Sequence, residues 1–326
     1  MMKLSFKKVP FQLKAPFAIT GYTFTCTDTV QVKLEEDGFR GQGEGVGVYY
    51  LGDTIDNMLS QLEGVADSVA GGVTHTDLIQ LLPPGGARNA LDCAFWDLTA
   101  KRTGVSVWDS LNLVPNKLKT VCTIGIGDND LMAQSAIDYA NYTNLKIKLD
   151  GNDPIGKLEA IRAVRPDATL IIDVNQGWTF EELKEYAPAA GRLNIAMIEQ
   201  PLKRGEDDIL AGFKSPVPLG ADESCLDASE YAAAAERYDV INIKLDKCGG
   251  LTAGLILANM ALKDNKALMV GNMTGSSLSM APAYVIGQFC EFVDIDGPLL
   301  LADDVENPLC FGEGGVVDVP NPDLWG

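Results

Sequence analysis

Eight short apolar runs recur at regular spacing through the last two thirds of the chain, and segments with helical patterning separate them. One run with the segment that follows takes about 22 to 27 residues, the length of a minimal strand–helix unit. Because eight such units close a parallel sheet on itself, the spacing predicts an α/β barrel. An open doubly wound sheet usually has fewer strands and a dinucleotide fingerprint, which is absent here. The runs are 119–124, 145–149, 169–174, 195–199, 217–221, 240–245, 267–271 and 292–295.

The chain outside these runs has a different pattern. Residues 28–50 alternate apolar and polar side chains around a turn at Glu36-Asp37-Gly38, which predicts a β-meander, and 87–102 has helical spacing. We therefore expect residues 1–115 to form an α+β domain and residues 116–297 to form the barrel. Residues 298–326 are rich in Gly and Pro, and we expect them to pack back against the N-terminal domain.

The charge balance limits the partners of the protein. Acidic residues outnumber basic residues 45 to 26, for a net charge of −19, and no Lys/Arg-rich run interrupts the excess. Nucleic acid and anionic membranes would be repelled, so neither is expected as a partner. No signal-peptide pattern or long apolar stretch is present, which predicts a cytoplasmic protein. The sequence leaves open whether the chain forms a homo-oligomer.

Charged residues stand at the ends of several of the expected strands. A charge at such a place is costly unless it points into the mouth of the barrel, where the active sites of such barrels lie. Side chains two residues apart on a strand face the same way, so two lysines of the second run share a face, as do two aspartates of the eighth. In chain order these residues are Lys146, Lys148, Asp173, Glu199, Asp222, Lys244, Asp294 and Asp296.

The carboxylates at the ends of runs three to five indicate a metal site. Asp173, Glu199 and Asp222 would converge, and a hard divalent cation with oxygen ligands is the natural counter-charge, so we expect one Mg²⁺ per subunit. A single Asp at a strand end more often caps the next helix, and Asn175 or Glu223 could be the functional member of its pair. Lys148 and Lys244, from runs on opposite sides of the ring, would face one another across the mouth.

At these residues the sequence resembles the muconate lactonising branch of the enolase superfamily, over essentially the whole chain. The resemblance implies an α+β capping domain, completed by the C-terminal segment, over a modified (β/α)₇β TIM-type barrel that binds Mg²⁺. It also implies that Lys148 and Lys244 are catalytic. The matching motifs are Lys146-Ile147-Lys148, Asp173-Val174-Asn175, Glu199-Gln200-Pro201, Ala221-Asp222-Glu223-Ser224, Ile243–Gly250 and the segment Ala87–Leu98.

A metal-bound carboxylate has an acidified α-proton, because the enediolate formed by its loss is stabilised by the metal. A lysine base then needs a lowered pKa, which we expect from burial and from the positive charges of Mg²⁺ and Lys146. Bases on both faces of one carbon allow 1,1-proton transfer, which is epimerisation. Asp294-Ile295-Asp296 resembles the motif with which dipeptide epimerases hold the substrate ammonium group. We therefore expect an isomerase that inverts the α-carbon of the C-terminal residue of a dipeptide.

The capping loop indicates which dipeptides would be substrates. Alanyl-glutamate epimerases that resemble this chain have an arginine there, whereas this loop offers Tyr22 and Phe24 as substrate-binding residues. We therefore expect an apolar or small C-terminal residue in preference to Glu. A cationic C-terminal residue remains an alternative, because Asp53, Asp128 and Asp130 lie near predicted loops.

The alternatives within the superfamily are an o-succinylbenzoate synthase, a muconate cycloisomerase and an N-acylamino acid racemase. Relatives of mandelate racemase need a histidine on a late barrel strand, and the one histidine, His75, precedes the barrel. From a different class, a non-catalytic peptide-binding protein remains as an alternative.

Overall fold

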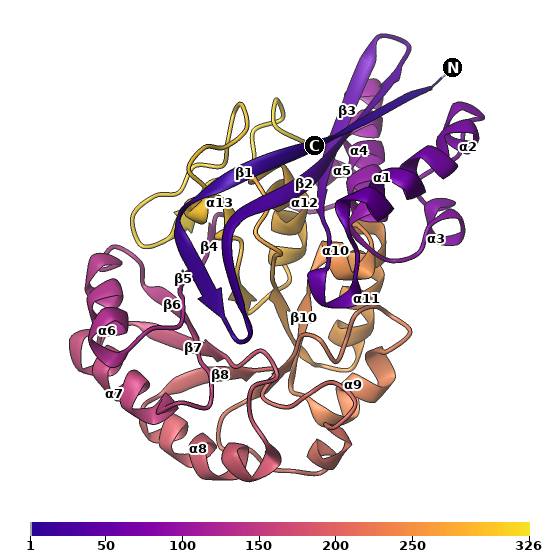
Figure 1. Ribbon diagram of the computed structural model, residues 1–326. Helices are drawn as coiled ribbons and strands as arrows, with labels where there is room; N and C mark the ends of the chain where they lie inside the picture. Colours follow the sequence, from indigo (N-terminus) through magenta and orange to yellow (C-terminus); the bar gives the residue numbers. More distant parts are fainter. Residues whose placement is uncertain (1) are drawn as a thin grey trace.

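The computed structural model describes residues 2–326, and its N-terminal part is an antiparallel sheet of three long strands, β1 (Lys3–Ile19), β2 (Tyr22–Glu36) and β3 (Phe39–Val46). Glu36 pairs with Phe39, so Asp37-Gly38 is a two-residue turn, and both residues have positive φ as such a turn requires. The sheet extends over one end of the molecule, and the β1–β2 hairpin reaches down towards the second sheet (Figure 1).

Helix α4 (Gly86–Thr103) packs directly on β3. Alternate residues of β3 are glycines, and they face the helix so closely that side chains would not fit: a Cβ on Gly43 would lie 2.2 Å from Ala90 O, and one on Gly45 would lie 2.0 Å from Gly86 O. The glycine run of this strand therefore serves helix–sheet packing. Shorter helices surround this unit: η1 (Tyr49–Leu51), α1 (Ile55–Gly64), α2 (Ala66–Ala70), α3 (Leu78–Leu81) and α5 (Val107–Ser110).

The second sheet has eight parallel strands in sequential order and confirms the predicted barrel class. Val121 N donates to Val293 O at 2.9 Å, which joins the first strand to the last. Five side chains fill the interior of the barrel, among them Ile171, Met197 and Met269. The strands are β5 (Cys122–Ile124), β6 (Asn144–Lys148), β7 (Thr169–Asp173), β8 (Ile195–Glu199), β9 (Leu219–Ala221), β10 (Val240–Ile243), β11 (Ala267–Val270) and β12 (Phe292–Val293).

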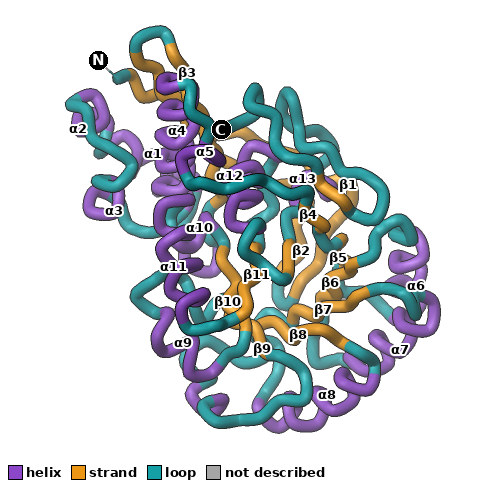
Figure 2. The backbone as a smooth tube through the Cα atoms, turned by 180° about the vertical axis from the view of Figure 1, so that it is seen from behind, coloured by secondary structure: helices purple, strands orange, loops and turns teal. Residues whose placement is uncertain are grey.

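Helices cover the outer face of this sheet, as the view from behind shows (Figure 2). Local sequence sets where they begin: Thr179 and Glu182 form a capping box at the start of α8, and Asp153 accepts from Gly156 N at the start of α7. They are α6 (Asn129–Asp138), α7 (Pro154–Val164), α8 (Phe180–Arg192), η2 (Asp208–Leu210), α9 (Tyr231–Arg237), α10 (Leu245–Cys248), α11 (Leu251–Lys263), α12 (Ser277–Gly287) and α13 (Gly297–Leu300).

The C-terminal segment contacts both parts of the fold. Its strand β13 (Val316–Val317) pairs with β4 (Leu118–Lys119), just before the barrel. Ala302 N donates to Gln12 O, and Trp325 Nε1 donates to Cys93 O on α4. The last residues thus connect the N-terminal sheet and its helix to the barrel. Within residues 2–326, no helix has the length and apolar character needed to span a membrane.

Candidate active site

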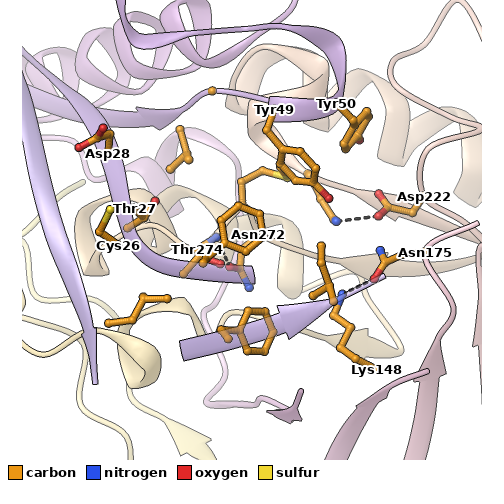
Figure 3. Close-up of a pocket in the computed structure, with 18 of the residues that line it drawn as sticks. Cys26, Thr27, Asp28, Tyr49, Tyr50, Lys148, Asn175, Asp222, Asn272 and Thr274 are labelled. Atoms are coloured by element: carbon orange, nitrogen blue, oxygen red, sulfur yellow. Dashed lines mark hydrogen bonds and ion pairs between the residues drawn. The ribbon is translucent and has the colours of Figure 1, made fainter. Parts of the chain in front are cut away.

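A cavity of about 210 Å³ lies where the carboxyl ends of the barrel strands meet the N-terminal sheet. Its barrel side is polar and includes Lys148, Asp222 and Lys244, whereas residues of β1, β2 and the loop after β3 close the opposite side (Figure 3). The cavity is smaller than pockets for drug-sized ligands, roughly 300–1,000 Å³, so it suits a small substrate.

Two buried lysines face this cavity from different strands. Lys148 is the last residue of β6, and its Nζ donates to Asp173 Oδ2 at 2.6 Å and to Asn175 Oδ1 at 3.1 Å. Lys244 directly follows β10, and its Nζ donates to Asp222 Oδ2 at 2.7 Å. The structure thus brings together the two lysines that the sequence places on separate strands.

Asp173, Glu199 and Asp222 lie fully buried at the ends of β7, β8 and β9. The ammonium group of Lys146 joins two of them, with Nζ 3.1 Å from Asp173 Oδ2 and 2.7 Å from Glu199 Oε2. Glu199 Oε2 nevertheless receives no hydrogen bond of good geometry. Within residues 2–326, no three Asp, Glu, His or Cys side chains are arranged to hold a metal ion as they stand, because lysine ammonium groups take up these oxygens.

The donor set still fits a divalent cation by its charge. Six buried carboxylates gather at the strand ends against four buried lysines, so two negative charges have no counter-charge. Hard carboxylate oxygens are the ligands that Mg²⁺ prefers, and Glu199 Oε2 is one of them, buried with the charge of Lys146 beside it but without a hydrogen bond. The carboxylates are Asp173, Glu199, Asp222, Glu223, Asp294 and Asp296, and the lysines are Lys146, Lys148, Lys244 and Lys247.

The excess of carboxylates over lysines also affects the pKa values of these carboxylates. Burial and the nearby Asp173 raise the pKa of Glu199 to about 7, and burial and Asp222 raise the pKa of Glu223 to about 8. Burial alone would also raise the pKa of Asp173, but Lys148 and Lys146 lower it to about 2. At neutral pH Glu223 is therefore mostly protonated and Glu199 is about half protonated, and a bound cation would displace these protons.

The expectation of a lowered lysine pKa applies to the site with Mg²⁺ bound, and for the protein groups alone the pKa of Lys244 shifts in the other direction. Burial acts in the expected direction, but the attraction of Asp222 and Glu199 outweighs it, so the pKa of Lys244 is raised. The carboxylates against which Lys244 packs thus have a larger effect on its pKa than its positive neighbour Lys146. A cation on those carboxylates would reduce this attraction.

Asp294 and Asp296 lie after β12, buried beside the cavity rather than directly on its surface. Asp294 Oδ2 accepts from Lys146 Nζ at 2.8 Å, and Asp296 Oδ2 accepts from Thr123 N at 2.8 Å. Asn272, which does line the cavity, donates from Nδ2 to Asp294 Oδ1 at 2.9 Å. Burial and the neighbouring Asp294 raise the pKa of Asp296 to about 7. Of the two carboxyl groups, Asp296 is the one without a lysine.

The capping side of the cavity is mainly apolar and aromatic. Phe24 lines it together with Phe17 and Tyr49, whereas Tyr22 does not; its side chain is 48% exposed. Tyr22 touches the lining only through ring contacts, with centroids 6.1 Å from Phe24 and 4.6 Å from Tyr49. Among residues 2–326, the Lys and Arg side chains on the lining are Lys148 and Lys244.

The acidic residues considered for a cationic substrate are placed elsewhere. Asp53 accepts from Gly86 N at 2.9 Å, and Asp128 caps α6 by accepting from Leu131 N. Asp130 lies in the first turn of the same helix. In the described part of the chain, the acidic side chain on the capping side of the lining is Asp28, which pairs with Lys8 at 2.7 Å.

Sequence reasoning missed several residues of the site. Asn272 lies two residues after the end of β11, and an amide at such a place is a weaker signal than a charged residue. Tyr49 and Tyr50 come from a loop that no pattern assigned to the barrel mouth. Lys247 stands three residues after Lys244, and this spacing on a helical turn was the available signal.

A parallel barrel with lysines and carboxylates at its mouth, closed by an α+β cap, defines a capped barrel enzyme of the enolase type. The chain belongs to the mandelate racemase/muconate lactonizing enzyme family: the model of its N-terminal domain matches residues 1–112, and the enolase C-terminal domain-like model matches residues 130–322.

Named relatives and solved structures are similar over almost the whole chain. The L-Ala-D/L-Glu epimerase of Escherichia coli is 40% identical, covering 93% of this chain and 95% of its own, and the N-acetyl-D-glutamate racemase of a Pseudoalteromonas species is 36% identical, covering 91% and 95%. An enolase family member from Agrobacterium tumefaciens with bound sodium and L-Ala-L-Glu is 40% identical over the full length of both chains, with a TM-score of 0.97. A dipeptide epimerase from Enterococcus faecalis with Mg and L-Leu-L-Tyr is 26% identical, with a TM-score of 0.91, and covers 98% and 97%.

Proposed function

We propose that this protein is a Mg²⁺-dependent dipeptide epimerase that inverts the α-carbon of the C-terminal residue. The observation that carries the proposal is the placement of Lys148 and Lys244, which reach one small cavity from different strands and flank buried carboxylates. Simple binding of a peptide would not require two lysines beside one cavity. Relatives named as dipeptide epimerases, similar over the whole chain, support the same reaction.

Asp173, Glu199 and Asp222 would hold the Mg²⁺. When bound, the ion would stabilise the negative charge that develops on the substrate carboxylate as the α-proton leaves. It would also supply the two positive charges that the cluster lacks. The ammonium groups of Lys146, Lys148 and Lys244, which now occupy the carboxylate oxygens, would have to turn away from them.

The two lysines would divide the proton transfer. One, in its neutral form, takes the α-proton on its Nζ, and the other, as an ammonium group, returns a proton to the opposite face of the same carbon. The protonation states of the two lysines are then exchanged, so the next turnover can run in reverse or after proton exchange with water. Neither lysine needs to form a covalent bond to the substrate.

The positions of the other groups orient the substrate. Its carboxylate would lie at the Mg²⁺ and its α-proton would face a lysine. Its peptide nitrogen would point towards β12, where Asp294 and Asp296 would bind the ammonium group of the N-terminal residue. A cation there is favourable because Asp296 is buried without a lysine of its own. Only the side chain of the C-terminal residue is left, and it would point to the cap.

The cap wall supports an uncharged side chain at that position. Phe17, Phe24 and Tyr49 offer apolar and aromatic surface, and a substrate glutamate would meet no cation there. The nearest charged group of the cap lining is Asp28, whose sign is wrong for a carboxylate. We therefore expect dipeptides with an apolar C-terminal residue to be preferred over L-Ala-L-Glu.

The runner-up is an N-acylamino acid racemase, and the relative named N-acetyl-D-glutamate racemase favours it. Such substrates have no ammonium group and would leave Asp296 without a cationic partner. An o-succinylbenzoate synthase or muconate cycloisomerase would have the same difficulty. A non-catalytic peptide-binding protein would not exchange α-protons at all.

The test is α-proton exchange in D₂O with Mg²⁺ present, followed by mass spectrometry over a library of dipeptides and N-acetylated amino acids. We expect deuterium to enter the C-terminal residue of free dipeptides, with inversion of that residue. Exchange confined to N-acylated substrates would replace the proposal by the racemase, and no exchange with any compound would favour the binding protein.

A further inference from the structure

Lys247 is a second buried lysine beside Asp222, and no role follows for it from the proton transfer itself. It lies in the single turn of α10, and its side chain is completely shielded from solvent. Its Nζ donates to Asp222 Oδ1 at 2.7 Å and to three main-chain oxygens: Asp222 O at 2.6 Å, Cys225 O at 3.1 Å and Asn242 O at 3.1 Å. All its donors are used, so the ammonium group is fixed in place.

Asp222 is therefore held by two lysines of the same short helical turn. Lys244 takes one carboxylate oxygen, Oδ2, and Lys247 takes the other, Oδ1. Lys247 N also donates to Lys244 O at 3.0 Å, so the backbone of Lys244 belongs to the turn that carries Lys247. The side chain that anchors Asp222 is thus rigidly connected to the proposed base that contacts it.

The other proposed base has the same arrangement. Lys148 contacts Asp173 Oδ2 at 2.6 Å, and Lys146, two residues earlier on β6, contacts that oxygen at 3.1 Å. On each side of the cavity, one lysine lines the cavity and a second lysine, away from the lining, contacts the same carboxylate. The pairs are Lys244 with Lys247 on Asp222, and Lys148 with Lys146 on Asp173. Lys146 and Lys247 come from different kinds of element, a strand and a helical turn, so local sequence does not impose this correspondence.

We propose that Lys247 is the positioning residue of the Lys244 side, fixing the Asp222 carboxylate and the ends of β9 and β10 so that Lys244 is held at its face of the substrate. The proposal rests on the two-base function above. Removal of the Lys247 ammonium group frees Oδ1 and three main-chain oxygens at and after the ends of β9 and β10, so the turn that begins at Lys244 loses its anchor. Lys148 keeps its own contacts with Asp173 and Asn175.

The experiment compares the two epimers of one dipeptide within a single variant. Lys244→Ala first assigns the epimer whose α-proton Lys244 removes, because its exchange in D₂O is lost. In Lys247→Met, which keeps the length and apolar stem of the side chain, we expect exchange of that epimer to fall at least tenfold more than exchange of the other. Effects of a weakened metal site act on both epimers and cancel in this ratio.

Lys157→Met is the matched control, because Lys157 is also buried and paired, with Asp150 at 2.7 Å, but does not touch the carboxylate cluster. We expect its ratio to equal that of the wild type. If Lys247→Met does not fold, Lys247→Gln, which keeps two N–H donors without the charge, is measured in the same way.

An equal fall for both epimers in the Lys247 variant, or no fall, would overturn the positioning role. Failure of the proposed function is a different result. In that case Lys244→Ala would not lose α-proton exchange of one epimer and Lys148→Ala that of the other.

Discussion

The barrel mouth and the cap wall form opposite sides of one cavity, but they are built from different kinds of residue. The barrel side carries buried lysines and carboxylates that pair with one another at 2.6–2.8 Å. The cap side presents Phe17, Phe24 and Tyr49; both phenylalanines pack against a small apolar cluster, and Phe24 contacts the Tyr49 ring edge to face. The ends of the parallel strands fix the positions of the charged groups, whereas the cap hairpin determines the shape of the opposite wall of the cavity.

This difference suggests a division of labour. Charged groups at the strand ends are each held by several partners, so a substitution there affects the reaction itself. Aromatic residues on the hairpin have no such partners, so a substitution there should change which side chain is accepted. Substitutions on the two sides of the cavity should therefore have different consequences.

Lys148→Ala and Lys244→Ala should each lower the rate of epimerisation by at least about 10³-fold, since each removes one of the two groups that move the proton. Each metal ligand keeps one lysine partner, Asp173 with Lys146 and Asp222 with Lys247, so both variants should fold. Circular dichroism checks the fold, and loss of optical inversion checks the activity. Retention of full epimerisation by either variant would contradict the two-base mechanism.

An N-acetylated dipeptide should have a kcat/KM at least about tenfold lower than the free dipeptide, equivalent to about 1.4 kcal/mol of lost interaction with Asp294 and Asp296. Asp296→Asn should remove most of this discrimination, because its side chain no longer carries a negative charge for the ammonium group. Steady-state kinetics on both substrates measure the ratio, and Mg²⁺ titration by calorimetry checks that the metal still binds. Equal turnover of the two substrates by the wild type would favour the racemase.

Phe24→Arg should raise kcat/KM for L-Ala-L-Glu relative to L-Ala-L-Leu by about tenfold, because it places a cation on the cap wall where the substrate side chain would lie. Phe24→Gln is the control for polarity without charge and should produce a much smaller change in the ratio. Competition assays with both dipeptides give this ratio directly. A wild-type preference for L-Ala-L-Glu would show that the cap wall does not exclude the anionic side chain.

The stability of the metal-free protein should fall as the pH rises from about 5 to 8. The pKa values of Glu199 and Asp296 are raised to about 7 and that of Glu223 to about 8. The folded chain therefore binds more protons than the unfolded chain in this window, and deprotonation destabilises it. Asp173, with its pKa lowered to about 2, is ionised in both states there and does not contribute.

Mg²⁺ should reverse this loss, so it should raise the melting temperature more at pH 8 than at pH 6. Each kcal/mol of added unfolding free energy should raise the melting temperature by about 2–4 °C. Thermal melts with and without Mg²⁺ at both pH values measure the difference. Asp92 and Asp246, buried at the contact between cap and barrel with pKa values near 7, would cause a similar loss that Mg²⁺ does not reverse. A Mg²⁺ effect that does not depend on pH would assign the raised pKa values to such positions instead.

Strand order and the identity of the charged residues could be predicted from the sequence. Each apolar run is long enough to define a strand, and a charge at the end of a buried strand is rare enough to be noticed. The cap side could not be predicted in the same way. Tyr22 and Phe24 are two residues apart on β2, yet Phe24 lines the cavity and Tyr22 does not, because the hairpin bends over the barrel mouth.

The barrel, the order of its strands and the set of lysines and carboxylates at its mouth follow from local patterns and a repeated unit in the sequence. The pairing of those charges depends on tertiary structure. Lys146 lies against Asp173, Glu199 and Asp294 from three other strands or strand ends, and Lys247 closes on Asp222 across a loop. Such contacts depend on the closure of the sheet, which brings together residues up to 148 positions apart in the chain.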